Sequence, residues 1–329
     1  MKPLLTVQNL RTYYFTEMGV VKAVDGVSFT LNRGESMGIA GESGCGKSTI
    51  GLSLMRLVRS GKIVEGQIML DGDNLVEISE RQFRYIRGKR ISMVNQGAMG
   101  ALNPVYTIGD QIVEAIMAHV KCSGAEALER TKELLRQVNV NASRAKSYPH
   151  ELSGGMRQRA MIAMALACDP ELLIADEPTT ALDVVTQAQV INLIKELRTR
   201  LSISIILISH DLAILSQACS KIMIMYAGKV MELADVQDLF REPQHPYTKG
   251  LLSSCTDLEA SRRTLTGIPG KPPSLVDPPA GCRFHPRCAC TQTICKTIEP
   301  TLVEVLPRHY AACHILGSFT EDNCSGDNV

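Results

Sequence analysis

Gly41-Glu42-Ser43-Gly44-Cys45-Gly46-Lys47-Ser48-Thr49 is the stretch of sequence that decides the fold of this chain. Its glycines let the backbone turn tightly, so that successive N–H groups can face phosphate oxygens. Lys47 supplies a point charge for the β- and γ-phosphates of a nucleotide, and the Ser48 hydroxyl is suited to bind Mg²⁺. We expect a strand over 36–40 and a helix over 47–57, whose N-terminal dipole also favours phosphate. The residues expected to contact the nucleotide are Gly41, Ser43, Gly44, Gly46, Lys47, Ser48 and Thr49.

Composition excludes several other classes of protein. The 329 residues contain 35 Lys and Arg against 34 Asp and Glu, so the chain lacks the basic excess with which nucleic-acid binders neutralise phosphates. No run approaches the ~18 to 20 apolar residues that span a bilayer. Residues 1–6 lack the apolar core and cleavage site of a signal peptide. We therefore expect a cytoplasmic protein without nucleic-acid partners.

Apolar runs and helical periods alternate along the chain, which indicates an α/β fold with a mostly parallel sheet. Helical spacing dominates over about 98–167 and returns at 184–201, and a hairpin is expected at 222–232. Further strands are expected at 27–31, 66–70, 90–94, 171–176 and 203–209. Proline is frequent between 266 and 281, which excludes regular helix or central strand there.

The run Leu172-Leu173-Ile174-Ala175-Asp176-Glu177 ends an apolar strand in two carboxylates. A strand that ends in acidic residues is weak evidence alone, but it becomes strong when it follows a phosphate-binding loop. Asp176 is expected to bind Mg²⁺, directly or through water, and Glu177 to polarise the attacking water.

A second glycine-containing run, Leu152-Ser153-Gly154-Gly155-Met156-Arg157-Gln158-Arg159, decides the family. Ser153 is suited to cap a helix, and Gly154 and Gly155 would expose N–H groups at its N-terminus to phosphate. A capped core helix is the structural alternative. Together with the two motifs above, this run resembles the signature sequence of ABC-transporter ATPases.

The resemblance covers about residues 4 to 250 and implies further site residues. Gln96 matches the Q-loop glutamine that binds Mg²⁺ and water, and His210 matches the switch histidine that contacts the γ-phosphate. Ala181-Leu182-Asp183 matches the D-loop at the dimer interface. Tyr14, or the neighbouring Tyr13, fits the aromatic that stacks on adenine, although a core role is equally compatible with the pattern. The resemblance implies two cassettes that enclose ATP between the P-loop of one and the signature run of the other.

Three segments narrow the resemblance to one branch. The stretch 101–109 is similar to that of peptide- and nickel-importer ATPases, and His245-Pro246-Tyr247-Thr248 is similar to a motif of the same group. The tail from Gly267 onward is similar to that of dipeptide and oligopeptide importer ATPases. The family implies two transmembrane permeases, a second ABC ATPase (homologous or identical) and, indirectly, an extracytoplasmic solute-binding protein. It also implies a peripheral position on the cytoplasmic face of the cell membrane.

The cysteines are unevenly distributed, because six of the eleven fall between Cys282 and Cys324. In a cytosolic protein such a cluster favours metal binding over disulfides. The resemblance implies a [4Fe–4S] cluster on four of them. These four are Cys282, Cys288, Cys295 and Cys313. The tail has no Cys-x-x-Cys pair, which argues against a zinc knuckle. Zinc with His285 or His309 as substitute ligands, and free thiols, remain alternatives.

The expected organisation is an ABC ATPase domain over 1–250, with a helical subdomain at about 98–167 and an antiparallel edge. A proline-rich connector over 251–281 and a cysteine-rich tail over 282–329 follow. One departure from the family concerns the Q-loop, where Asn95 replaces an aromatic and Gly97 an acidic residue. Coupling to the membrane subunit is therefore expected to differ from that of typical relatives.

The leading hypothesis is an ATP-hydrolysing subunit of a dipeptide or oligopeptide importer. Import of nickel or a metal chelate is the close alternative. A soluble ABC ATPase of translation or DNA repair is disfavoured, because the chain has neither two cassettes nor a long coiled-coil insertion.

Overall fold

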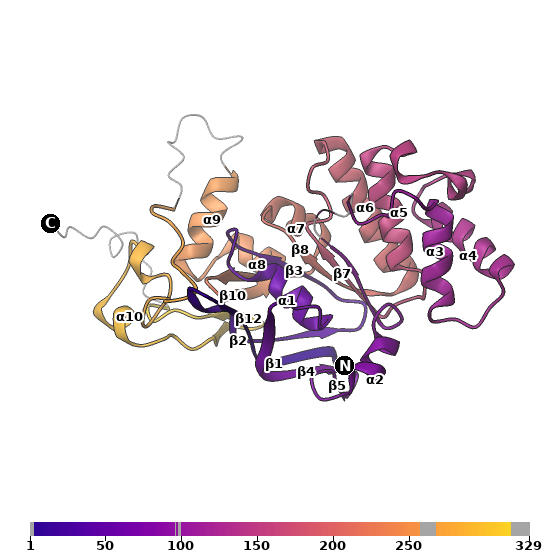
Figure 1. The fold of residues 1–329 in the computed structure, drawn as a ribbon. Coiled ribbons are helices and arrows are strands. Elements are labelled where there is room, and N and C mark those ends of the chain that lie inside the picture. The colour runs from indigo at the N-terminus through magenta and orange to yellow at the C-terminus, as the bar shows by residue number, and fades with distance from the viewer. Residues whose placement is uncertain (1–2, 96, 98–99, 257–267, 317–329) are drawn as a thin grey trace. The chain divides into compact units, whose positions relative to one another are not determined.

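The structure of the chain is a computed structural model that describes residues 3–95, 97, 100–256 and 268–316 (Figure 1). The chain forms two compact units. The helical unit consists of Met1–Leu5, Leu31–Ser36 and Leu70–Ile208. The P-loop unit consists of Thr6–Thr30, Met37–Met69 and Ser209–Val329.

Three parallel strands form the centre of the helical unit: β6 (Ile91–Val94), β7 (Leu172–Asp176) and β8 (Ser204–Ile208). β7 pairs with β6 on one side and with β8 on the other. All residues of β7 and β8 are buried, as expected for parallel strands covered on both faces. At the carboxyl end of β7, Ala175 lies opposite Val94 of β6, and Asp176 lies opposite Ile208 of β8.

The helices of this unit pack mainly against one another. α3, α4 and α5 contact each other, and α5 also contacts α6 and β6 (Figure 1). Capping boxes at Ser79, Thr107 and Ser123 define the starts of α2, α3 and α4. The remaining elements are β5 (Asp73–Asn74), α2 (Glu80–Ile86), α3 (Ile108–Met117), α4 (Gly124–Gln137), η2 (Ala142–Lys146), η3 (Pro149–Glu151), α5 (Gly154–Ala165) and α6 (Val184–Leu201).

The P-loop unit contains a mixed sheet that joins the glycine loop to the C-terminal tail. β3 (Ser36–Ala40) runs parallel to β9 (Lys221–Tyr226), which forms an antiparallel hairpin with β10 (Lys229–Asp235). β12 (His309–Ala311) adds to β10, and β11 (Val303–Leu306) adds to β12, both antiparallel. The described part of the tail is thus built into the same unit as the glycine loop.

Three longer strands, in the order β2-β1-β4, complete the strands of this unit. They are β1 (Pro3–Thr16), β2 (Gly19–Asn32) and β4 (Gly61–Leu70). The helices are α1 (Lys47–Leu54), α7 (Leu212–Ala218), α8 (Val236–Arg241), α9 (Pro246–Thr256), η4 (His285–Arg287) and α10 (Thr293–Thr297).

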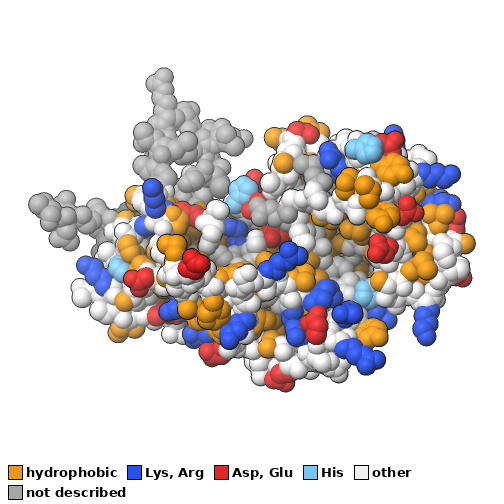
Figure 2. All heavy atoms as spheres, in the orientation of Figure 1, with side chains coloured by type: hydrophobic (Ala, Val, Ile, Leu, Met, Phe, Trp, Pro, Cys, Tyr) orange, Lys and Arg blue, Asp and Glu red, His pale blue; other side chains and the backbone are white. Residues whose placement is uncertain are grey.

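The structure confirms several sequence predictions and corrects others. The helix over 184–201 and the hairpin at 222–232 are confirmed. The helix predicted over 47–57 ends earlier, at Leu54, because Arg56 adopts a left-handed φ of 50° that no α-helix continues through. The strand predicted over 27–31 is the end of the longer β2. Figure 2 shows acidic and basic side chains interspersed on the face in view, in keeping with a formal net charge of +1.

Candidate nucleotide-binding site

The glycine loop connects the buried strand β3 to helix α1 within the P-loop unit. Gly41 has φ 146°, and a Cβ there would lie 2.2 Å from the carbonyl oxygen of Met225. Gly46 has φ 105°, and a Cβ there would lie 2.0 Å from the carbonyl oxygen of Ala23. Both the backbone conformation and the close approach therefore require glycine.

Lys47, the first residue of α1, is buried with 6% of its surface exposed. Its Nζ donates to the carbonyl oxygens of Gly41 (2.8 Å) and Glu42 (3.0 Å). The ammonium group is therefore positioned along the loop by the loop's own backbone. A nucleotide phosphate would compete for these same donors, as expected for a phosphate-binding lysine.

The two neighbouring tyrosines of β1 have different environments. The Tyr13 hydroxyl donates to Asp25 Oδ1 at 2.7 Å, and burial together with this hydrogen bond raises the pKa of Tyr13. The Tyr14 hydroxyl lies 3.3 Å from Thr49 Oγ1 on α1. Tyr14 is thus the tyrosine beside helix α1. Tyr13 instead hydrogen-bonds to the buried carboxylate Asp25, which also forms ion pairs.

Asp176 and Glu177 lie at the carboxyl end of β7 in the helical unit. Asp176 is 3% exposed, and Glu177 adopts a φ of 45° that turns the chain out of the strand. The Glu177 N–H donates to the Ile208 carbonyl at 2.9 Å, and Glu177 Oε2 accepts a hydrogen bond from Thr180 Oγ1 at 2.9 Å. Backbone and side chain of Glu177 are therefore both held at the strand end.

The signature run lies at the start of α5, also in the helical unit. Ser153 Oγ accepts the Met156 N–H at 3.3 Å and so caps the helix. A Cβ on Gly155 would lie 2.6 Å from Thr186 Cγ2, and Thr186 is in turn hydrogen-bonded to Asp183, the N-cap of α6. Gly154 and Gly155 at this helix start are half-buried. The structure therefore shows the cap, and the phosphate-binding role of the run stays a prediction.

The remaining predicted site residues divide between the units. His210, which is exposed, belongs to the P-loop unit with the glycine loop and Tyr14. Ser153, Asp176 and Glu177 belong to the helical unit. Gln96 lies outside the described residues.

Four tail cysteines line one small pocket in the P-loop unit: Cys282, Cys288, Cys295 and Cys313. Burial raises the pKa of Cys288 to about 12 and that of Cys313 to about 11. His245 also lines the pocket, and burial lowers its pKa to about 4.

Within the described ranges, no three His, Cys, Asp or Glu side chains form a group that could hold a metal ion. The two histidines considered as zinc ligands are placed differently. His285 lines the cysteine pocket, and its Nδ1 lies 2.9 Å from the Cys282 carbonyl oxygen. His309 is fully buried elsewhere, with Nε2 2.6 Å from Glu232 Oε1.

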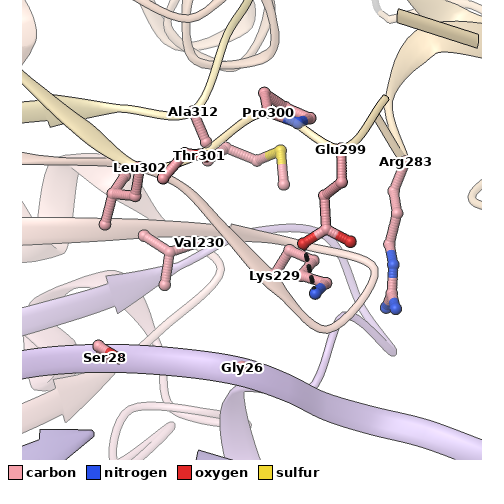
Figure 3. Close-up of a pocket in the computed structure, with 11 residues that line it drawn as sticks. Gly26, Ser28, Lys229, Val230, Arg283, Glu299, Pro300, Thr301, Leu302 and Ala312 are labelled. Atoms are coloured by element: carbon pink, nitrogen blue, oxygen red, sulfur yellow. Dashed lines mark hydrogen bonds and ion pairs between the residues drawn. The ribbon is translucent and has the colours of Figure 1, made fainter. Parts of the chain in front are cut away.

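Ion pairs join the tail to the rest of the P-loop unit, and the sequence analysis did not predict them. Arg283 binds the Asp25 carboxylate and the Ala227 carbonyl oxygen. Lys229 Nζ lies 2.6 Å from Glu299 Oε1, and Figure 3 shows this pair next to Arg283 at a cavity of about 380 Å³. Asp25 and Arg283 are 258 residues apart in sequence, so no local pattern signals the pair.

None of the helices described in the structure combines the length and apolarity that a membrane crossing would require.

Comparison with known proteins identifies the family. A model of the ABC transporter family matches residues 24–180, and a model of the oligopeptide/dipeptide transporter C-terminal region matches residues 231–295. The chain is 49% identical to a probable peptide ABC transporter ATP-binding protein of Sinorhizobium fredii, over 94% of both chains. It is 48% identical to the oligopeptide transport ATP-binding protein AppD of Bacillus subtilis, over 92% of this chain and 94% of that protein.

A solved structure confirms the expected fold. The fold is similar to that of a dimeric ATP-binding cassette bound to ADP and phosphate, with a TM-score of 0.64 and 27% identity, over 70% of this chain and 98% of that chain. The predicted P-loop ATPase fold, with a mixed sheet and helices, is therefore confirmed. The chain belongs to the ABC transporter ATP-binding proteins, in the branch that contains the oligopeptide and dipeptide transport ATP-binding proteins.

Proposed function

We propose that this protein hydrolyses ATP to energise an importer of dipeptides or oligopeptides. The observation that carries the proposal is the combination of a glycine loop with a positioned Lys47 and a C-terminal region that matches the oligopeptide/dipeptide transporter model. The relatives are named for peptide transport, which supports peptides as the cargo and gives no support to nickel.

Within this function, each site residue has a distinct role. The P-loop backbone and Lys47 bind the phosphates, while Ser48, Asp176 and Gln96 bind Mg²⁺. Glu177 polarises the attacking water, and His210 contacts the γ-phosphate. The hydrogen bond from Thr180 to Glu177 supports this role, because it holds the carboxylate in one orientation at the strand end.

The protein works with partners on the cytoplasmic face of the membrane. Two permease subunits receive the conformational change, and Ser153, Gly154 and Gly155 bind the ATP held by a second cassette. The cassette extends over 1–250 and the tail over 282–329, and the described part of this tail adds to the edge of the cassette. The pairing of β12 with β10 supports this arrangement, because it continues the sheet of the cassette into the tail.

Peptide uptake and ATP hydrolysis provide the test. The protein is expressed with its permease, solute-binding and partner ATPase subunits, and uptake of a labelled dipeptide, a labelled oligopeptide and nickel is measured. Wild type is expected to support peptide uptake only. Glu177→Gln is expected to abolish uptake and to lower kcat about 10²-fold or more, because a positioned base contributes about that much.

A matched control is Glu171→Gln, at the other end of β7. Glu171 forms ion pairs with Arg33 and Arg90 and lies outside the proposed machinery, so its variant should keep peptide uptake. Nickel uptake without peptide uptake would contradict the proposed cargo. A normal kcat in Glu177→Gln would contradict the proposed base.

We also propose that the tail cysteines hold a [4Fe–4S] cluster. Four thiols line one pocket, which is the donor set that such a cluster uses. The thiolates that bind a four-iron cluster lie farther apart than those that bind one metal ion. A cluster is therefore compatible with the finding that the described residues contain no group able to hold a single ion. A bound cluster would supply positive charge that favours thiolates, together with one-electron redox chemistry.

Anaerobic purification tests this second proposal. Wild type should contain about four irons and four acid-labile sulfides per chain, as a [4Fe–4S] cluster requires. Cys288→Ser should lose both, whereas Cys219→Ser, outside the tail, should keep both. Zinc in place of iron, or no metal in anaerobic wild type, would overturn the cluster proposal.

A further inference from the structure

Glu42, inside the glycine loop, forms an ion pair with an arginine of the tail. Arg287 Nη1 donates to Glu42 Oε2 at 2.6 Å, and Arg287 Nη2 donates to Glu42 Oε1 at 3.0 Å. The two parallel hydrogen bonds form the fork geometry in which arginine binds carboxylates most strongly. The side chain of Arg287 is 6% exposed and that of Glu42 25%, so solvent screens this pair far less than a surface pair.

The other donors of Arg287 are also occupied. Nε donates to the Pro269 carbonyl at 2.7 Å, Nη2 to the Ile268 carbonyl at 3.2 Å, and Nη1 to the Tyr226 hydroxyl at 3.2 Å. A guanidinium has five N–H groups, and all five are used. The hydrogen bond to Glu42 raises the pKa of Arg287, so its charge is permanent. Arg287 is immobilised and has no donor left for a phosphate.

Glu42 connects this arginine to the residue that holds the phosphates. Its carbonyl oxygen accepts a hydrogen bond from Lys47 Nζ at 3.0 Å, and its N–H donates to the Tyr247 hydroxyl at 3.0 Å. Carboxylate, amide and carbonyl of Glu42 are therefore all held. Without Arg287, an uncompensated carboxylate would remain in the loop that must receive the negative charge of a nucleotide.

Arg287 lies in η4, between two of the cysteines that line the tail pocket. Within this turn, the Arg287 N–H donates to the Phe284 carbonyl at 3.0 Å, and the Cys288 N–H donates to the His285 carbonyl at 3.3 Å. The Phe284 ring packs edge-on against Tyr226, with ring centroids 5.2 Å apart. The position of the guanidinium thus depends on how the tail is folded at the cysteine pocket.

We propose that Arg287 is a positioning residue for nucleotide binding, which neutralises and orients Glu42 so that the glycine loop accepts ATP. The tail thereby becomes part of the nucleotide site, although no tail residue need touch the nucleotide. The inference rests on the proposed function of the glycine loop as the ATP-binding element.

The test compares nucleotide affinity with turnover in the full-length protein. Arg287→Met is expected to weaken binding of Mg-ATP about tenfold, a coupling of ordinary size for a residue that acts through another. Its kcat at saturating ATP should stay within about threefold of wild type, because Glu177 and His210 are unaltered. Arg308→Met is the matched control, since Arg308 is a tail arginine, 68% exposed, that pairs with Asp235. It should bind ATP like wild type.

A rescue experiment separates positioning from a merely structural role. Glu42→Gln removes the charge that Arg287 compensates, so Arg287→Met/Glu42→Gln should regain most of the lost affinity. Thermal unfolding identifies variants that fail to fold, and Arg287→Lys then replaces Arg287→Met. Arg287→Lys keeps the positive charge but cannot form the two parallel hydrogen bonds to Glu42, so its loss of ATP affinity should be intermediate.

Wild-type affinity in Arg287→Met, a loss confined to kcat, or no rescue by Glu42→Gln would overturn the inference. Absence of ATP binding by wild type would instead refute the proposed function of the loop.

Discussion

Asp25 is the residue through which several positive charges hold the tail in place. Arg283 binds one carboxylate oxygen, Lys229 lies 3.5 Å from the same oxygen, and Arg11 lies 3.1 Å from the other. Burial raises the pKa of Asp25, but the hydrogen bond from Tyr13 and the charges of Lys229, Arg283 and Arg11 outweigh it. The pKa of Asp25 therefore lies below its usual value, and the folded state favours the ionised form.

We predict that Asp25→Asn lowers the free energy of unfolding by about 3 kcal/mol, because it leaves buried cations without their counter-charge. The depressed pKa also sets the pH dependence. The stabilisation by Asp25 is complete above the unfolded pKa of about 4 and is lost as the pH falls through the lower folded pKa. Urea unfolding at several pH values between 7 and 3 should therefore show a steeper acid loss in wild type than in Asp25→Asn.

The control for this prediction is Asp235→Asn. Asp235 pairs with Arg308, whose side chain is 68% exposed, so its loss should cost less than about 1 kcal/mol. Equal stability of Asp25→Asn and wild type at pH 7, or parallel acid profiles, would show that Asp25 does not anchor the tail.

At the scale of single elements, the start of α6 limits the size of the side chain at the start of the signature helix, α5. Thr186 Oγ1 donates to Asp183 Oδ2 at 2.6 Å, which fixes the Thr186 rotamer and points Cγ2 at Gly155. A methyl group on Gly155 would lie 2.6 Å from that carbon. Helices α5 and α6 thus approach closely enough that only glycine fits.

We predict that Gly155→Ala lowers the free energy of unfolding by about 2 kcal/mol, as is typical when a packed contact is overfilled. Thr186→Ser removes Cγ2 but keeps the hydroxyl, so Gly155→Ala/Thr186→Ser should recover most of the loss. Gly124→Ala, at the start of α4 with nothing within 4 Å of the added carbon, is the control and should cost nothing. Chemical denaturation measures all three, and absence of recovery in the double variant would contradict the proposed clash.

The elements that sequence patterns predicted best are those with an uninterrupted period. α6 runs over 18 residues with buried positions at helical spacing, and its predicted bounds are correct. β1 was not predicted, because its alternation of buried positions changes phase at Asn9, which has φ 46°. β12 has only three residues, too few for any period to show.

Whether a site residue could be predicted depends on how far apart in the sequence the interacting residues lie. The glycine loop is contiguous, so the sequence alone predicts its function, whereas Arg287 and Glu42 are 245 residues apart and each lacks a signal of its own. Tyr13 and Tyr14 are equivalent in the sequence pattern and differ only through partners that the fold supplies.

At the scale of the whole molecule, we predict that the starts of α5 and α6 contact a second cassette. Val184 and Val185, directly after the Asp183 cap, are 80% and 68% exposed. The close approach of Gly155 to Thr186 places these valines near the Ser153–Gly155 start of α5, so the two helix starts would offer a partner apolar contact and phosphate-binding N–H groups. A partner that brings ATP to Ser153 would cover them.

We therefore predict that Glu177→Gln accumulates as a dimer in ATP and Mg²⁺, with itself or with its partner ATPase, because the bound γ-phosphate cannot be removed. Analytical ultracentrifugation should show the dimer in ATP and dissociation in ADP. Adding Ser153→Arg should prevent dimerisation, while the Kd for ATP of the single chain stays unchanged, since in the proposed function Ser153 binds the nucleotide of the partner. A Glu177→Gln chain that stays monomeric in ATP both alone and with its partner, or a Ser153→Arg variant that still dimerises, would exclude the shared site.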